Sequence, residues 1–283
     1  MRHAKNLLAM GHLVFGSDTD ANAVKEFIRV GGGHLGQDDR FKGDGVVIAS
    51  PTTRHVLDML RTAAWERPFF VEKPIANSKV AASVEEALKY CKMVGYNLRF
   101  HSCVKKAREW LPLIGAPHDA HFTCAQFNAK PSYLRDGVIL NWSHEIDLAL
   151  YLLGPAKVIK SETHLTDGKD DSTDIWLRHD SGCISTIHLD YLTTPEDRGF
   201  QIAGESGVIV ADLVGRRIKK TTNIPGVHWI DVKCGGSFDE DYVEEMQAFI
   251  DRLDGKETLG CSAEEGLEIL KICLEVRKQG GLT

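Results

Sequence analysis

The chain has 283 residues, 43% hydrophobic and 26% charged, a length and balance typical of a globular protein with two domains. It contains 34 lysines and arginines and 40 aspartates and glutamates, which gives a net charge of -6. This charge and the lack of a basic stripe argue against a nucleic-acid partner. No apolar stretch approaches the ~20 residues that cross a bilayer and no signal peptide is recognisable, so we expect a cytoplasmic protein without a membrane partner.

Seven cysteines are spread along the chain without a Cys-x-x-Cys pair: Cys91, Cys103, Cys124, Cys183, Cys234, Cys261 and Cys273. Their odd number and wide spacing indicate reduced thiols with a structural role, because buried cysteine usually behaves as a small hydrophobic residue. No cysteine or histidine pair has the spacing of a zinc site, so the sequence predicts no metal.

The first 115 residues alternate short apolar runs with helix-like segments. A continuous apolar run such as Gly45–Ser50, bounded by Pro51, is typical of a strand buried on both faces of a parallel sheet. The predicted strands are 13–15, 45–50, 68–71 and 93–100, and the predicted helices are 5–10, 21–30, 53–65, 83–90 (opened by a capping box at Ser83) and 101–111. This alternation predicts a doubly wound α/β domain.

After about Gly115 the pattern changes to β-rich segments of period two, separated by turn residues. The segments 121–129, 183–191 and 207–213 predict an open, mainly antiparallel sheet. One helix is predicted at 138–153, a second at 242–253, and a third begins at Ser262, which forms a capping box with Glu265. The chain therefore divides into two predicted domains, residues 1–115 and 116–283.

Four patches, in this order, resemble the Gfo/Idh/MocA family of NAD(P)-dependent dehydrogenases. They are Ala49–His55, Glu72-Lys73-Pro74, Ser143-His144-Glu145-Ile146-Asp147, and Arg198 through Gly204–Gly207. The closing helix pair is a fifth point of similarity. The resemblance covers nearly the whole chain, and the order and spacing of the patches are more specific than any one of them.

The resemblance implies a Rossmann domain at 1–115 that binds the dinucleotide, followed by an α/β domain at 116–283 that binds the substrate. In this family the open sheet of the second domain commonly mediates oligomerisation, so we expect a homodimer or homotetramer. The implied reaction is hydride transfer between a nicotinamide cofactor and a hydroxyl-bearing carbon of a sugar, nucleotide sugar or cyclitol. The Ser-His-Glu-Ile-Asp form resembles a branch linked to surface-sugar biosynthesis, which points to a sugar or nucleotide sugar.

Lys73 and His144 are the catalytic residues that the resemblance implies. An ammonium at the reacting oxygen stabilises developing negative charge, and a lysine whose pKa is lowered by burial can exchange the proton. His144 and Asp147 are three residues apart and project from one face of a predicted helix, which suits a histidine held by a carboxylate. Without the resemblance, a surface lysine and a structural histidine are the ordinary interpretations.

The resemblance also implies the remaining site residues. The substrate site comprises Lys73, Asn97, Arg99, Asn141, His144 and Asp147, and the cofactor site comprises Asp18, Ser50, Pro51, Thr52, His55, Glu72 and Lys73. Many members carry an aspartate four residues before the histidine, where this chain has Leu140 followed by Asn141. An amide can orient a hydroxyl but cannot accept its proton as a carboxylate does. Arg198 is assigned to an anionic substrate group or to a structural ion pair.

The glycine loop that holds the pyrophosphate is expected to be missing, because Arg2–Leu8 resembles the helix just past that loop. Asp18 falls where the ribose-binding acid belongs and would favour NAD over NADP, or it is an ordinary turn aspartate. Gly31–Gly36 fits Gly-x-Gly-x-x-Gly letter for letter, but it follows a helix and runs into polar residues. We therefore interpret it as a helix stop.

Three alternatives stay open. The chain could be a non-catalytic paralogue that binds sugar or forms oligomers; the missing glycines favour this reading, whereas Lys73 and His144 oppose it. Met1 could be an artefact of start-site choice, with the loop encoded upstream. A family member could also keep NAD and use transient oxidation to cleave a glycosidic bond, and the sequence does not separate this reaction from a dehydrogenase.

Overall fold

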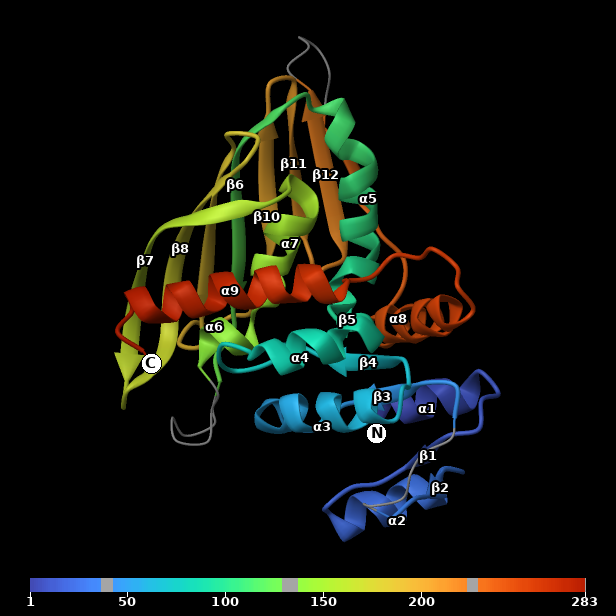
Figure 1. Ribbon diagram of the computed structural model, residues 1–283. Helices are drawn as coiled ribbons and strands as arrows, with labels where there is room; N and C mark the ends of the chain where they lie inside the picture. Colours follow the sequence, from blue (N-terminus) through green and yellow to red (C-terminus); the bar gives the residue numbers. More distant parts are fainter. Residues whose placement is uncertain (37–42, 129–136, 223–228, 283) are drawn as a thin grey trace.

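The computed structural model describes residues 1–36, 43–128, 137–222 and 229–282. Within them, two small parallel sheets built from residues 15–95 lie below one large, mainly antiparallel sheet (Figure 1). Helices pack on these sheets, and none of the helices in the described part is long and apolar enough to cross a membrane. The predicted α/β fold with a parallel part and an open, mainly antiparallel part is thus confirmed.

The first part of the chain alternates short parallel strands with helices, as its apolar runs predict. One sheet pairs β1 (Phe15–Gly16) with β2 (Gly33–His34), and the other has the order β3 (Val46–Ile48), β4 (Phe69–Glu72), β5 (Cys91–Gly95). The helices are α1 (Arg2–Ala9), α2 (Ala21–Arg29), α3 (Thr52–Ala64) and α4 (Ala82–Ala87), with 3-10 turns η1 (Leu88–Tyr90) and η2 (Asn97–Phe100). Strand β4 is central, and its residues Phe69, Phe70 and Val71 are completely buried.

Two local predictions in this part are wrong. The predicted capping box at Ser83 does not form, because α4 begins at Ala82 with Ala81 as its N-cap and no side-chain cap, which places Ser83 inside the helix. The predicted strand 93–100 ends at Gly95 and continues as the turn η2. This turn directs buried polar side chains, among them Arg99, toward partners elsewhere in the fold.

The glycine cluster after α2 ends the helix, as we expected. Gly31 has a φ of 101°, which favours glycine. A Cβ at Gly32 would lie 2.2 Å from the ring of Phe27, and a Cβ at Gly33 would lie 2.4 Å from the ring of Phe15. Two of these glycines are therefore explained by close packing on aromatic rings, and the run Gly31–Gly36 continues into a strand and not into a helix.

The large sheet has eight strands in the order β13-β12-β11-β10-β6-β9-β8-β7, and all neighbours are antiparallel except β6 and β9. Its strands are β6 (Pro117–Ala125), β7 (Ala156–Thr166), β8 (Lys169–His179), β9 (Ile184–Asp190), β10 (Asp197–Gly204), β11 (Gly207–Asp212), β12 (Arg217–Thr222) and β13 (Ile230–Lys233). The expected segments 121–129, 183–191 and 207–213 correspond to β6, β9 and β11, except that residue 129 lies outside the described residues.

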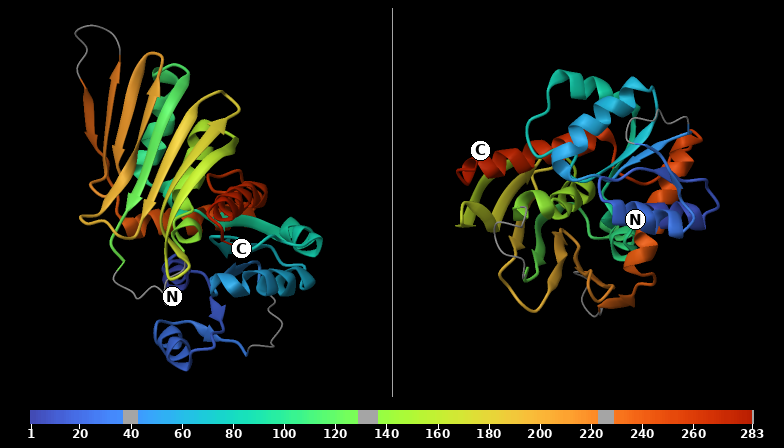
Figure 2. Two further views of the ribbon diagram at one scale, coloured as in Figure 1. Left: turned by 90° about the vertical axis from the view of Figure 1, so that its left-hand side faces the viewer. Right: turned by 90° about the horizontal axis from the view of Figure 1, so that it is seen from below.

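Helices cover one side of the large sheet (Figures 1 and 2). They are α5 (Ser102–Trp110) with the turn η3 (Leu111–Leu113), α6 (Val138–Asn141), α7 (His144–Leu153) and α9 (Ala263–Gln279). Helix α9 begins with the predicted capping box of Ser262 and Glu265. Helix α8 (Phe238–Leu253) instead packs against α1 and β5, so a late segment of the chain completes the core beneath the first part. The domain boundary at residue 115 stays a prediction. Helix α8 belongs to the predicted second domain by sequence but packs against elements of the predicted first domain.

The helix predicted at 138–153 is broken into α6 and α7 at Trp142 and Ser143. The break starts a new helix N-terminus whose first turn carries Glu145 and Asp147, where negative side chains are favourable for the helix dipole. It also puts Asn141 at the end of one helix and His144 at the start of the next. Asn141 and His144 therefore have different neighbours from those that they would have in an unbroken helix.

Candidate active site

Lys73 follows the end of β4, and its ammonium group donates a hydrogen bond to the backbone carbonyl of Asn141 at the end of α6. Two residues that the sequence assigns to the substrate site therefore meet across 68 positions of the chain. The preceding residue, Glu72, accepts a hydrogen bond from Nε2 of His3 at 2.6 Å. This contact joins α1 to the end of β4, so the Glu-Lys-Pro turn is tied both to the start of the chain and to α6.

The polar residues at the N-terminus of α7 are buried and are held by partners from other elements. Ser143 accepts a hydrogen bond from Tyr96 at 3.2 Å. Glu145 pairs with Arg198 of β10 at 2.7 Å, and Asp147 pairs with Arg99 of η2 at 2.6 Å. These bonds fix the helix end that carries His144, because a buried charge left without its partner is strongly unfavourable.

His144 is 7% exposed and packs edge-on against the ring of Tyr96 at 5.5 Å between centroids. Its Nδ1 has no hydrogen-bond partner within the described residues. Burial, followed by the charges of Lys73 and Arg198, lowers its pKa well below 6.5. The imidazole is therefore neutral at physiological pH, and its Nδ1 is buried without a protein partner among the described residues.

The same surroundings shift the pKa of Lys73. Burial lowers it most, and the nearby charge of Arg198 lowers it further, while Glu72 and Glu145 oppose this shift. A desolvated lysine beside a second cation gives up its proton more readily than a lysine in water. For Glu72, burial opposes ionisation, but the hydrogen bond and charge of His3 outweigh it and lower the pKa. Lys73 thus combines a lowered pKa with a fixed position.

A polar pocket of about 290 Å³ opens beside Asn141. The amide of Asn141 donates a hydrogen bond to the hydroxyl of Tyr191, whose ring stacks edge-on with Trp142 at 4.4 Å between centroids. The lining residues are Gln126, Phe127, Asn128, Asn141, Trp142 and Tyr191. Aromatic rings beside amide groups match a sugar ring, which presents an apolar face and a rim of hydroxyls.

Sequence reasoning missed most of this pocket, although a signal for it exists. Gln126–Asn128 follows β6, and Tyr191 follows β9. These two strands are parallel neighbours, so their carboxyl ends lie at the same edge of the sheet. Backbone bonds from Gln126 to Asp190 and from Asn128 to Tyr191 continue the pairing beyond the strands. Polar and aromatic residues directly after two strands were the available signal, but their parallel pairing is not evident from the sequence.

Several residues assigned to the substrate are occupied by protein partners. Arg99 donates two hydrogen bonds to Asp147 Oδ1, at 2.9 and 2.6 Å, and further bonds to Glu265 and the carbonyl of Gly260. Arg99 and Asp147 are 2% and 0% exposed, and Asn97 is 2% exposed. The ion pair of Arg198 with Glu145 corresponds to the structural alternative. Of the substrate set, Asn141 lines the polar pocket. Lys73 bonds to the backbone carbonyl of Asn141, and His144 follows three positions later at the start of α7.

The residues assigned to the cofactor follow the carboxyl ends of parallel strands. Ser50 lies two residues after β3, and its hydroxyl donates a hydrogen bond to the Asp58 carboxylate at 2.7 Å. Pro51 is the N-cap of α3, which has no side-chain cap, and Thr52 begins that helix. His55 is 1% exposed, and its two ring nitrogens lie 2.9 Å from the carbonyl of Pro74 and 2.8 Å from that of Ser50. This histidine connects the β3–α3 loop to the Glu-Lys-Pro turn.

Asp18 lies just after β1 and is exposed. Its carboxylate accepts the backbone N–H of Asp20 at 2.9 Å, which forms a local turn. The second carboxylate oxygen is not used in that bond, so the turn is compatible with a further hydrogen bond to a ribose hydroxyl. Among the described residues, no group of three or more histidine, cysteine, aspartate or glutamate side chains is placed to hold a metal ion.

Comparison with known proteins explains this arrangement. Residues 105–210 match the family described as GFO/IDH/MocA C-terminal domain. By sequence, this segment of the chain resembles that domain. The expected resemblance to that family is confirmed, and the match includes α7 with His144 and the strands that end at Gln126 and Tyr191. No curated protein sequence matches the chain.

Solved structures match almost the whole chain at low sequence identity, which shows a common fold. Levoglucosan dehydrogenase in complex with NADH and levoglucosan has a TM-score of 0.89 at 16% identity, over 99% of this chain and 94% of that chain. UDP-N-acetylglucosamine 3-dehydrogenase GnnA from Acidithiobacillus ferrooxidans has 0.85 at 19%, over 98% and 92%. An oxidoreductase from Agrobacterium radiobacter, in complex with NAD+, L-tartaric acid and magnesium, has 0.84 at 20%, over 98% and 93%.

The donor set at the Lys73 end of the chain fits a nicotinamide dinucleotide. Open α/β sheets bind nucleotides at the carboxyl ends of their parallel strands, where Ser50 and Glu72-Lys73 lie. The uncapped N-terminus of α3 offers backbone N–H groups at the same edge. When bound there, the nicotinamide would accept or release a hydride. The residues that would hold it are Ser50, Pro51, Thr52 and Lys73, with Asp18 toward the ribose.

Proposed function

We propose that the chain is an NAD-dependent oxidoreductase that interconverts a hydroxyl and a carbonyl on a sugar or nucleotide sugar. The observation that carries the proposal is the bond of Lys73 to Asn141, which lines a pocket of amides and aromatic rings. The matched structures support it, because they include dehydrogenases of levoglucosan and of UDP-N-acetylglucosamine. We further propose a cytoplasmic homodimer or homotetramer that associates through the open face of the large sheet.

In the oxidation direction, a nicotinamide bound at the Lys73 end would supply the hydride acceptor, and the substrate hydroxyl would lose a proton. Lys73 in its neutral form would accept this proton and become an ammonium. The substrate, having lost a hydride and a proton, would become a neutral carbonyl compound. Neutral His144 would bond the same hydroxyl and orient it. Asn141 holds Lys73 through its backbone and Tyr191 through its side chain, so it would set the distance between the base and the pocket.

Arg99, Asp147, Glu145 and Arg198 are positioning residues in this proposal. Their ion pairs hold the N-terminus of α7, and none of them needs to touch the substrate. Arg198 has a second role, because its charge lowers the pKa of both Lys73 and His144.

Cofactor titration by calorimetry tests the proposal. We expect saturable binding of NADH and weaker binding of NADPH, because the Asp18 carboxylate would repel a 2′-phosphate. In Asp18→Asn the preference for NADH should fall by about ten- to a hundred-fold, the size of one charge-assisted interaction. Absence of binding at millimolar cofactor would contradict the enzyme and leave a cofactor-free paralogue. An unchanged preference in Asp18→Asn would identify Asp18 as a turn residue only.

The pH dependence of the oxidation reports on Lys73. The base must be neutral to accept a proton, so kcat/KM should rise with pH through the pKa of Lys73. Burial and Arg198 lower this pKa below its ordinary value of 10.5, so the rise should be complete at lower pH than for a lysine in water. The measurement is a pH profile with NAD and a panel of sugars that includes levoglucosan and UDP-N-acetylglucosamine. A profile that shows no rise anywhere between acid and alkaline pH would exclude Lys73 as the base.

A further inference from the structure

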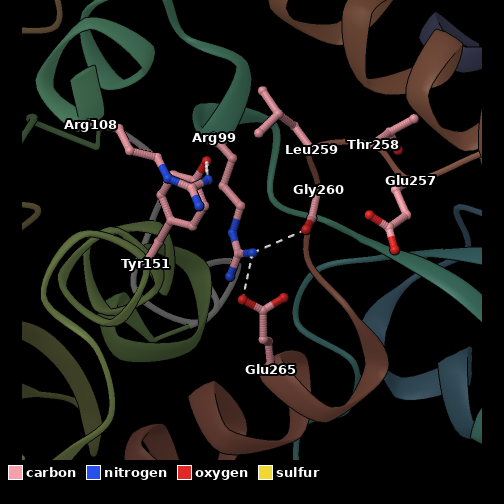
Figure 3. A pocket seen from close by; sticks show the side chains of 8 residues that line it. All are labelled: Arg99, Arg108, Tyr151, Glu257, Thr258, Leu259, Gly260 and Glu265. Carbon is pink, nitrogen blue, oxygen red and sulfur yellow. Dashed lines mark hydrogen bonds and ion pairs between the residues drawn. The ribbon is translucent and has the colours of Figure 1, made fainter.

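A second pocket, of about 400 Å³, shares no lining residue with the polar pocket beside Asn141. It lies where η2, α5, α7 and α9 meet the turn that joins α8 to α9 (Figure 3). Its lining residues are Arg99, Arg108, Tyr151, Glu257, Thr258, Leu259, Gly260 and Glu265. A volume of this size is within the range of small-molecule sites in proteins.

The ring of Tyr151 holds two arginines at the pocket wall. The guanidinium carbons of Arg99 and Arg108 lie 4.6 and 4.7 Å from the ring centroid, within the range of cation–π contacts. The charge of Arg99 is already neutralised by Asp147 and Glu265. Arg108 also donates a hydrogen bond to the hydroxyl of Tyr151, so its exposed guanidinium is held in place.

Arg108 and Glu257 differ from the other charged residues of this pocket. Within the described part of the chain, Arg108 has no carboxylate partner and Glu257 has no cationic partner. They also do not pair with one another, although both line the same pocket and are exposed. Figure 3 shows Arg108 beside Tyr151, and Glu257 on the other side of Gly260. The pocket therefore presents one unpaired positive and one unpaired negative group at separate points.

We propose that this pocket binds a small zwitterion, namely an α-amino acid. Its carboxylate would meet the guanidinium of Arg108, whose fork of N–H donors matches a carboxylate in geometry. Its ammonium would meet the carboxylate of Glu257. A simple anion would pair with Arg108 but would be repelled by the carboxylates of Glu257 and Glu265. A simple cation would pair with Glu257 but would be repelled by the guanidinium of Arg108. A ligand that carries both charges complements both groups.

Thermal-shift measurements with the twenty standard α-amino acids test this site, with acetate and ethylamine as single-charge controls. We expect at least one amino acid to raise the unfolding temperature, as a ligand specific to the folded state does, while acetate and ethylamine do not. Calorimetry with that amino acid should show affinity reduced by about ten- to a hundred-fold in both Arg108→Gln and Glu257→Gln. These side chains are exposed, so both variants are expected to fold.

Arg217→Gln serves as the control variant, because Arg217 is an exposed arginine of the large sheet outside this pocket. It should bind the amino acid as the unaltered chain does. No thermal shift with any amino acid would overturn the proposal, and so would a shift that both pocket variants retain. Because neither Lys73 nor His144 lines this pocket, its outcome is independent of whether NADH binds.

Discussion

Replacing Lys73 by methionine is expected to lower kcat by about 10²- to 10⁴-fold, the range that a positioned general base contributes. Methionine keeps much of the length and packing of lysine but has neither its charge nor its proton. Steady-state kinetics with NAD and the best sugar of the panel measure the loss. NADH affinity, measured by calorimetry on the same variant, should change far less, which places the effect in the chemical step and not in cofactor binding.

Lys73→Arg distinguishes the base from a mere positive charge. Arginine keeps the cation but does not give up its proton in the accessible pH range. We expect Lys73→Arg to be slow as well and to lose the rise of kcat/KM with pH. If Lys73→Arg restored most of the activity, the lysine would act by charge alone. If Lys73→Met kept near-normal kcat, Lys73 would not be a catalytic residue.

Replacing Arg99 by methionine should destabilise the fold by about 3–5 kcal/mol, the cost of breaking a buried ion pair by removing one partner. The substitution leaves the Asp147 carboxylate at 0% exposure without its guanidinium. Burial raises the pKa of Asp147 to about 6 even with Arg99 present. Urea unfolding, followed by circular dichroism, measures the change in the free energy of unfolding.

Two further variants show whether the loss comes from the unpaired carboxylate. Adding Asp147→Leu to Arg99→Met removes the stranded charge and should recover part of the stability, because apolar replacement of a whole buried pair is often neutral. Arg217→Met removes an arginine from an exposed pair with Asp231 and should change stability little. Normal stability of Arg99→Met together with a raised KM would instead support the substrate-binding role that the resemblance implies for Arg99.

The structural core of the proposed site was predictable from local patterns. The apolar run that ends at Glu72 predicts a buried strand, and a residue at the carboxyl end of such a strand lies at the ligand-binding edge of an α/β sheet. The patch with His144 indicated its element and its face. The capping box at Ser262 is equally local, because its two bonds join residues three positions apart. Each of these predictions depends on neighbouring residues only.

Other features depended on contacts that no local pattern contains. The bond from Lys73 to Asn141 spans 68 positions, the Arg99–Asp147 pair spans 48, and the Arg198–Glu145 pair spans 53. Each of these contacts joins two different elements and therefore depends on how those elements pack: Lys73 follows β4, Arg99 lies in η2, and Arg198 lies in β10. The sequence suggested that Arg99 and Asp147 could bind substrate, whereas packing places each of them against the other.

The sequence by itself determined the fold class, the alternation of strands and helices in the first part apart from β2, and the position of Lys73 just after a buried strand. It did so because hydrophobic period and turn residues act over a few positions. The tertiary structure alone decided the break between α6 and α7, the lining of the polar pocket by Tyr191, and the lowered pKa of Lys73. Those properties arise from burial and from charges brought close by the fold, which are set by the packing of distant segments.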